Sequence, residues 1–166
     1  MKTSLFLFLS FLFASCSGPQ GQSSQSGSWY TVKRVSDGDT FWVDDGSQSG
    51  LKVRMIGIDA PESHQTQYEE VQYFGKEAAA YLTGLIRGKK VRLEYDVERK
   101  DRYGRTLAYV YLEDGTFVNA EMIKNGYANL MTVPPNVKYV ERFTKLQSEA
   151  RKNRKGLWDQ EINTRK

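Results

Sequence analysis

The alternation of apolar and polar positions along the chain predicts five short β-strands in two groups. The first group is a meander of three strands rich in β-branched and aromatic residues, each followed by Asp, Gly, Ser or Pro residues that interrupt it. The second group is a pair of strands joined by a tight turn at 101–105. The predicted strands cover 29–35, 40–43, 51–58, 91–97 and 106–112.

Three further segments have the spacing of amphipathic α-helices. In the first, 76–87, apolar residues recur at intervals of three and four positions, and the segment ends before Gly88. A short helix is predicted over 118–125, ahead of Gly126, and a longer one over 137–153, with an apolar stripe opposite Lys and Arg. Five strands that close on one another with helices alongside are typical of the OB-fold. We therefore predict an α+β fold, a five-stranded OB-fold β-barrel with three α-helices.

The N-terminus has the pattern of an export signal. Met1 and Lys2 precede an apolar run from Leu5 to Ala14, which is too short to span a bilayer and is typical of a signal peptide. The single cysteine, Cys16, follows Phe, Ala and Ser in an order that resembles the lipobox of bacterial lipoproteins, in which a lipid on the cysteine tethers the protein to the membrane. Alternatively, Cys16 is incidental and stands beside a secretory cleavage site. We expect an exported protein, either a cell-envelope lipoprotein or secreted, without an intramolecular disulfide.

Composition divides the rest of the chain into a tether and one domain. Residues 16–28 are mostly Gly, Ser and Gln, which bury too little apolar surface to fold. The 166-residue chain is 39% hydrophobic and 13% aromatic, enough for one core. We expect a signal peptide over 1–15, a linker over 16–28, a domain over 29–158, a tail over 159–166, and a monomer. The net charge of +4 permits a nucleic-acid partner, although 20 acidic residues dilute the excess.

Acidic side chains gather at the ends of two predicted strands. Asp37 and Asp39 lie two positions apart after the first strand, and Asp59 and Glu62 surround Pro61 after the third. In extended backbone, residues two apart point to the same face. Carboxylates without His or Cys neighbours are hard ligands that suit calcium or magnesium rather than zinc. The pattern predicts a cation site built from these two strand ends.

Two arginines accompany these carboxylates. Arg54 stands five residues before Asp59, and strict alternation sends the two side chains to opposite faces unless a bulge or twist at Gly57 brings them together. Arg105 follows Gly104 in the turn between the last two strands. Guanidinium groups suit bidentate contact with phosphate. Phosphodiester hydrolysis requires a cation, donors that bind the phosphate oxygens and a positioned water.

Three segments resemble, in the same order, the signature blocks of the staphylococcal nuclease family: VSDGDT at 35–40, VRMIGIDAPE at 53–62 and DRYGRTLAYV at 101–110. The similarity extends from Trp29 to Trp158. Each block is a weak signal alone, but three in order are specific. The resemblance implies calcium-dependent hydrolysis of phosphodiester bonds in DNA or RNA, with 3′-phosphate ends as products and magnesium as the less suitable ion.

The resemblance also implies which residues hold the metal. Asp39 and Asp59 correspond to the calcium-binding carboxylates of the family, and the backbone carbonyl of Ala60 corresponds to a further ligand. Asp37 corresponds to a group just outside the ligands.

The remaining charged positions correspond to the hydrolytic groups of the family. Glu62 matches the acidic residue beside the attacking water, often described as the general base, while Arg54 and Arg105 match the arginines that bind the scissile phosphate and stabilise its transition state. The family's archetype also has two tyrosines that contact a bound nucleotide, and these are missing from 130–136, which reads LMTVPPN. A base-stacking contact of roughly 1–3 kcal/mol is therefore absent or supplied elsewhere.

Each of these features also has an ordinary structural interpretation. An Asp-Gly-Asp run alone is most often a turn, His64 in a polar loop is more often solvated than catalytic, and the basic run at 151–155 either holds phosphates or faces water.

The chain also fits a non-catalytic OB-fold module that binds nucleic acid on the cell envelope, because this barrel elsewhere serves mainly for binding. A structural envelope lipoprotein is a third, weaker alternative. Binding without hydrolysis would distinguish the module from an enzyme.

Overall fold

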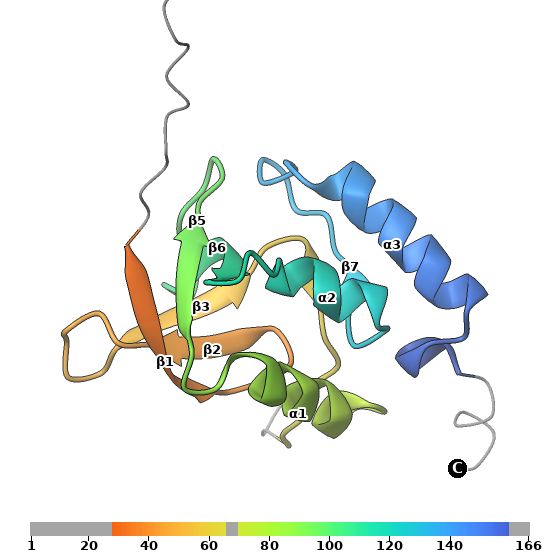
Figure 1. Cartoon of the computed structure of the whole chain (residues 1–166), viewed down its shortest axis with the longest axis horizontal. Coiled ribbons are helices and arrows are strands. Elements are labelled where there is room, and N and C mark those ends of the chain that lie inside the picture. The colour runs from red at the N-terminus through yellow and green to blue at the C-terminus, as the bar shows by residue number, and fades with distance from the viewer. Residues whose placement is uncertain (1–27, 66–69, 160–166) are drawn as a thin grey trace, which may run out of the picture.

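The computed structural model of the chain describes residues 28–65 and 70–159. The predicted signal peptide, Cys16, the linker up to residue 27 and the tail beyond Asp159 lie outside the described residues. Within the described part, no helix is both long and apolar enough to cross a membrane. Figure 1 shows a group of strands on one side of the molecule and two of the three helices, α2 and α3, on the other.

Five strands form a closed barrel in the order β1, β2, β3, β6 and β5. β1 pairs with β2 on one side and with β5 on the other, and every pair is antiparallel except β3 with β6, which is parallel. The predicted five-stranded barrel with three helices is confirmed. The strands are β1 (Trp29–Val35), β2 (Thr40–Val43), β3 (Leu51–Met55), β5 (Lys90–Glu94) and β6 (Thr106–Leu112).

Alternation along the strands separates the barrel interior from its outer face. Phe41, Val43 and Val53 are fully buried inside the barrel. Trp42 and Lys52 occupy the alternate positions of β2 and β3 and are only partly buried. The same alternation therefore builds the core and leaves a row of polar and aromatic side chains on the outside.

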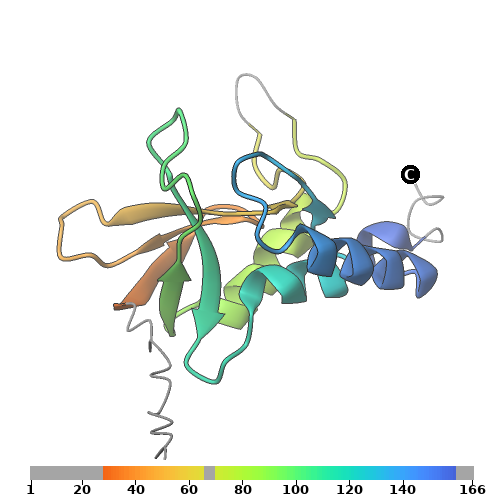
Figure 2. The same ribbon diagram turned by 90° about the horizontal axis from the view of Figure 1, so that it is seen from above.

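The three predicted helices are present, with small shifts at their ends. They are α1 (Gly75–Ile86), α2 (Val118–Lys124) and α3 (Val140–Lys152), followed by the 3-10 helix η1 (Gly156–Trp158). Seen from above, α3 lies at the end of the molecule opposite the loop that joins β2 to β3 (Figure 2).

Contacts with the barrel explain why α3 begins later than the predicted residue 137. The backbone N–H of Lys138 donates to Asp96 Oδ2 at 3.1 Å, and the Lys138 ammonium donates to Glu94 Oε1 at 2.7 Å. Both acidic residues lie in the segment predicted as a strand over 91–97, but β5 ends at Glu94. Asp96 therefore serves as an anchor for the start of α3 rather than as a strand residue.

The prediction of one uninterrupted strand over 51–58 is wrong. β3 stops at Met55, the chain turns, and β4 (Ile58–Asp59) pairs instead with β7 (Asn129–Leu130). Gly57 makes the turn possible: its φ is 81°, and a Cβ there would lie 2.6 Å from an aromatic ring of α3. The segment predicted as one strand therefore contributes β3 to the barrel and β4 to a separate pairing with β7.

Asn119, in the first turn of α2, locks this turn to the barrel. Its side-chain amide donates to the Ile56 carbonyl at 2.8 Å, and its side-chain carbonyl accepts from the Val110 N–H at 2.9 Å. Asn119 is fully buried. Burying either backbone group without a partner costs about 1–3 kcal/mol. Asn119 thus helps to determine where β3 ends and where the neighbouring Arg54 lies.

Candidate active site

Two loops pack tightly against each other at one end of the barrel. The first, 36–39, connects β1 to β2, and the second, 60–63, follows β4. A Cβ on Gly38 would lie 2.6 Å from the Cβ of Ala60 and 2.9 Å from the Cβ of Ala78. Only glycine permits so close a contact, so the Asp-Gly-Asp run is more than a turn. Its glycine lets two acidic loops meet.

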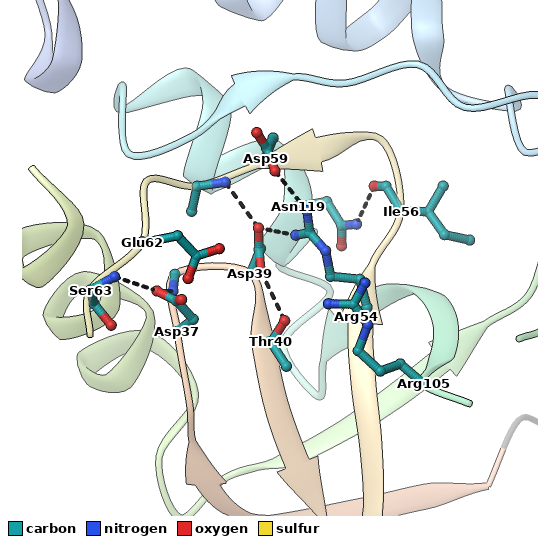
Figure 3. Close-up of polar contacts among 12 residues, drawn as sticks. Asp37, Asp39, Thr40, Arg54, Ile56, Asp59, Glu62, Ser63, Arg105 and Asn119 are labelled. Carbon is teal, nitrogen blue, oxygen red and sulfur yellow. Dashed lines mark hydrogen bonds and ion pairs between the residues drawn. The ribbon is translucent and has the colours of Figure 1, made fainter. Parts of the chain in front are cut away.

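Donors from neighbouring segments hold the carboxylates of the first loop (Figure 3). Asp39, which is 6% exposed, accepts hydrogen bonds from the Thr40 hydroxyl at 2.9 Å and from the Ala60 N–H at 3.0 Å. Asp37 accepts one from the Ser63 N–H at 3.2 Å. Both acidic side chains are therefore tied to the backbone of the second loop. The sequence predicted that these two strand ends would meet, but it did not predict the hydrogen bonds between them.

Arg54, near the end of β3, bridges Asp39 and Asp59. Its Nη1 forms an ion pair with Asp39 Oδ2, and its Nη2 donates to Asp59 Oδ1 at 2.8 Å. The side chains of Arg54 and Asp39 are 12% and 9% exposed, whereas that of Asp59 is 54% exposed. The bend predicted at Gly57 is present, and it brings Arg54 and Asp59 together despite their odd spacing. The two acidic loops therefore share one guanidinium group.

The surroundings of Arg54 move its pKa in opposite directions. Burial lowers the pKa of Arg54, the Asp59 carboxylate raises it, the Arg105 charge lowers it again and Glu62 raises it. The net effect is a pKa below the ordinary value, but an arginine stays protonated at neutral pH. The influence of Arg105 and Glu62 also places both of their charges near Arg54.

Asp101 orients Arg105 in the turn before β6. Arg105 Nε donates to Asp101 Oδ2 at 2.6 Å, and the Arg105 backbone N–H donates to Asp101 Oδ1 at 3.0 Å. Burial raises the pKa of Asp101, but the hydrogen bonds from Arg105 outweigh burial and bring this pKa below its ordinary value. Asp101 is therefore ionised at neutral pH and fixes the plane of the guanidinium group. In the sequence, Asp101 was identified only as a turn residue, although its four-residue spacing from Arg105 is a signal for such a pair.

Glu62 is positioned through its backbone. Its N–H donates to the Gln72 side-chain oxygen at 3.2 Å, and its carbonyl accepts from the Gln72 N–H at 2.9 Å. At the start of α1, a Cβ on Gly75 would lie 2.1 Å from the Glu62 carbonyl oxygen. The Glu62 side chain extends from its loop towards the turn that carries Asp37 and Asp39 (Figure 3). Neither Gln72 nor Gly75 was recognised from the sequence as a positioning residue.

A cavity of about 470 Å³ opens beside the two arginines. Its wall includes Arg54, Arg105, Tyr103, Met131 and Val133. The last three are 67%, 40% and 52% exposed, respectively. Met131 and Val133 belong to the stretch in which the two tyrosines of the family's archetype are missing. The cavity thus joins a cationic end to a largely aliphatic wall, with Tyr103 as an aromatic side chain in it.

The oxygen atoms of the two loops suit a hard cation. In segments 28–65 and 70–159, no three His, Cys, Asp or Glu side chains are placed to hold a metal ion between them. Asp39 and Asp59 nevertheless contact the same guanidinium group, that of Arg54, and the Ala60 carbonyl follows Asp59 in the chain. Water or phosphate oxygens would have to complete the roughly six to eight positions around calcium. This donor set fits calcium or magnesium and lacks the nitrogen and sulfur ligands typical of zinc.

Comparison with known proteins gives one consistent result. The family model described as "Staphylococcal nuclease homologue" matches residues 52–160. The chain is 45% identical over 156 residues to the thermonuclease of Staphylococcus hyicus, covering 92% of this chain and 90% of that protein. It is 42% identical over 153 residues to the thermonuclease of Staphylococcus intermedius, covering 91% and 89%. It is 37% identical over 136 residues to "Endonuclease YhcR" of Bacillus subtilis (strain 168), covering 78% of this chain and 11% of that protein.

The close packing of the two loops predicts the effect of a single methyl group. We expect Gly38→Ala to lower the free energy of unfolding by about 1–3 kcal/mol, because the methyl group forces the loops apart. Gly84→Ala is the matched control, since a Cβ on Gly84 in α1 meets nothing within 4 Å, and helix propensity predicts a gain of up to about 1 kcal/mol. Urea denaturation of both variants measures the two effects. A Gly38→Ala variant as stable as the wild type would contradict the packing described.

Proposed function

The chain belongs to the staphylococcal nuclease family and is therefore a phosphodiester hydrolase, and we propose that it is a calcium-dependent nuclease that cleaves DNA, RNA or both and leaves 3′-phosphate ends. One observation carries the proposal. The carboxylates of Asp39 and Asp59 contact two different nitrogens of the Arg54 guanidinium, and Arg105 lies near enough to lower the pKa of Arg54. Oxygen ligands for a cation and donors for a phosphate therefore lie together.

Asp39 and Asp59 are the side chains that would hold the metal, with the Ala60 carbonyl as a further ligand and Asp37 just beyond. Calcium accepts irregular coordination with several waters, whereas magnesium demands a near-ideal octahedron. The 54% exposure of the Asp59 side chain provides access for waters around either ion, and the resemblance to the staphylococcal nuclease family favours calcium. When bound, calcium supplies charge neutralisation at the phosphate.

The two arginines are suited to the charge that develops during hydrolysis. Attack of water on phosphorus places extra negative charge on the non-bridging oxygens, and guanidinium groups donate to such oxygens in pairs. Arg54 is held by two carboxylates and Arg105 by Asp101, so both guanidinium groups are held in defined positions before the substrate arrives. Preorganised donors of this kind contribute about 100- to 1000-fold in rate each.

Glu62 is the proposed acceptor of the water proton. Its backbone is clamped by Gln72 and packed against Gly75, so its side chain starts from a fixed point beside the other acidic groups. In the proposed reaction, the water oxygen bonds to phosphorus, its proton passes to Glu62, and the bond from phosphorus to the 5′ oxygen breaks, while the 5′ oxygen takes up a proton from solvent and leaves as a 5′-hydroxyl. The 3′ oxygen keeps the phosphate.

The arrangement of charges favours an enzyme over a module that only binds. Asp39, Asp59 and Glu62 would repel the phosphates of a bound polyanion, so a simple binding surface gains nothing from them. With a cation between the carboxylates and the phosphate, the same groups become useful. The non-catalytic module stays an alternative that a cleavage assay distinguishes from the enzyme.

We also propose that the protein is exported, as a lipoprotein tethered through Cys16 or in secreted form. The proposal rests on the apolar run from Leu5 to Ala14 and on the residues before Cys16. If Cys16 carries lipid, Cys16→Ser should move the protein from the membrane fraction of the producing cells to the medium. If the wild type and the Cys16→Ser variant are distributed equally between membrane and medium, the protein is secreted without a lipid tether. If both stay inside the cell, the proposal of export is wrong.

The proposed function predicts large kinetic effects at two residues that differ from a nearby control. Glu62→Gln and Arg105→Ala should each lower the turnover of denatured DNA by about 100-fold or more, while circular dichroism stays that of the wild type. Arg99→Ala removes an exposed arginine of the same segment and should keep full activity. A chelator should abolish hydrolysis, and added calcium should restore it. Binding of DNA without any calcium-dependent cleavage would instead identify a binding module.

Asp101→Asn tests whether Asp101 acts through Arg105. The asparagine keeps an oxygen for the backbone N–H groups of Tyr103 and Arg105 but loses the ionised oxygen that binds Arg105 Nε. We expect about a 10-fold fall in turnover, and no further fall when Asp101→Asn is added to Arg105→Ala, because positioning has no effect once its target is gone. Asp114→Asn, in a similar exposed turn, is the control. If the losses of turnover from the two substitutions multiply in the double variant, Asp101 does not act through Arg105.

A further inference from the structure

The outer face of β1, β2 and β3 carries two cations around one aromatic ring. In the barrel register, Arg34 pairs with Trp42, and Trp42 pairs with Lys52. The Arg34 guanidinium lies 4.5 Å from the centre of the Trp42 ring, and the Lys52 ammonium lies 5.8 Å from it. Because β2 is the middle strand, the cations reach the ring from its two neighbours. We call these three residues the cationic track.

The charges of the cationic track are not neutralised within the described part of the chain. Among residues 28–65 and 70–159, neither Arg34 nor Lys52 forms an ion pair with an acidic side chain. The adjacent Lys33 differs, because it lies 3.8 Å from Asp44. Trp42 is fixed by a hydrogen bond from its indole N–H to the Ser36 hydroxyl at 3.0 Å. The ring therefore holds two uncompensated cations in defined positions.

The cationic track is continuous with the candidate active site. Thr40 pairs with Arg54 in the same ladder, two positions along each strand from the Trp42 and Lys52 pair. Residues two apart share a face of the sheet and are separated by about 6.6 Å, and strands two apart lie about 9.6 Å from each other. The step along β3 from Arg54 to Lys52 is close to the distance between successive phosphates of an extended nucleic-acid strand, and the long side chains of Lys52 and Arg34 span the wider step between β3 and β1. A chain whose scissile phosphate lies at Arg54 can therefore place its next phosphates over Lys52 and Arg34.

We propose that the cationic track binds the phosphates that flank the cleavage position in a single-stranded polynucleotide. This inference rests on the proposed function, since it takes Arg54 as the site of the scissile phosphate. Trp42 positions the cations rather than stacking on a base, because Arg34 and Lys52 already lie over its ring. The contacts are to phosphate and carry no sequence information. The track makes the enzyme favour substrates several nucleotides long.

A purely structural role and a lipid-binding role for the track predict different results. If the cation–π contacts only stabilise the sheet, their loss lowers the midpoint of urea denaturation and leaves nucleic-acid binding unchanged. If the track binds an anionic lipid surface, vesicles containing phosphatidylglycerol should bind the protein through Arg34 and Lys52. Continuity with Arg54 favours nucleic acid over both.

The experiment compares the wild-type protein with the Arg34→Ala/Lys52→Ala double variant. The control, Lys124→Ala/Lys145→Ala, removes the same charge from α2 and α3. Binding of a labelled 12-nucleotide single-stranded DNA is measured by fluorescence anisotropy in chelator, so that no cleavage occurs, across a series of salt concentrations. Each lost phosphate contact reduces the slope of log affinity against log salt by about 0.7. We expect the slope to fall by about 1.4 in the track variant and to stay unchanged in the control.

Hydrolysis with calcium gives a second, independent readout. The track variant should lose about 10-fold in kcat/KM on the 12-nucleotide DNA and nothing on a dinucleotide, which is too short to reach the track. An unchanged salt slope, an equal loss in the control, equal losses on both substrates, or loss of vesicle binding without loss of DNA binding would each overturn the proposal. A wild-type protein that binds DNA through the track but never cleaves it would refute the proposed function and leave the track standing.

Discussion

The bridge that Arg54 forms between Asp39 and Asp59 is the interaction on which the site depends. It joins two loops of like charge that would otherwise repel each other, and it does so where Arg54 and Asp39 are almost completely buried. Removing one partner of a buried pair leaves an uncompensated charge, which costs about 3–5 kcal/mol. The same bridge sets the direction of the guanidinium group that is proposed to bind phosphate. Stability and function therefore rest on one contact.

The geometry around this bridge separates three tasks in space. The acidic loops provide oxygen atoms for a cation, the cavity beside Arg54 and Arg105 provides room for part of a nucleotide, and the outer face of the barrel provides further cations. Met131 and Val133 make the cavity wall aliphatic, so contact with a base relies on shape and on Tyr103. Contacts with the sugar-phosphate backbone then contribute more to substrate binding than base stacking does.

The sequence by itself determined the secondary structure and the set of chemical groups. Period-two and helical spacing located the barrel strands and the helices, because the side of each element that is buried repeats at short range. The three blocks that resemble the staphylococcal nuclease family identified the members of one site, namely Asp39, Asp59, Glu62, Arg54 and Arg105. A bend at Gly57 could also be inferred from the sequence, because strict alternation along one strand would place Arg54 and Asp59 on opposite faces.

Only the tertiary structure decided how those groups are held. Asn119 contacts Ile56 across 63 positions of the chain, and this contact, which no local pattern encodes, accompanies the end of β3 within a segment that reads as one strand. The fit of Gly38 against Ala60, and of Gly75 against the Glu62 carbonyl, likewise depends on which distant segments meet. Spacing along the chain reports burial and local hydrogen bonding. The orientation of a side chain towards a substrate is set by neighbours that folding alone brings together.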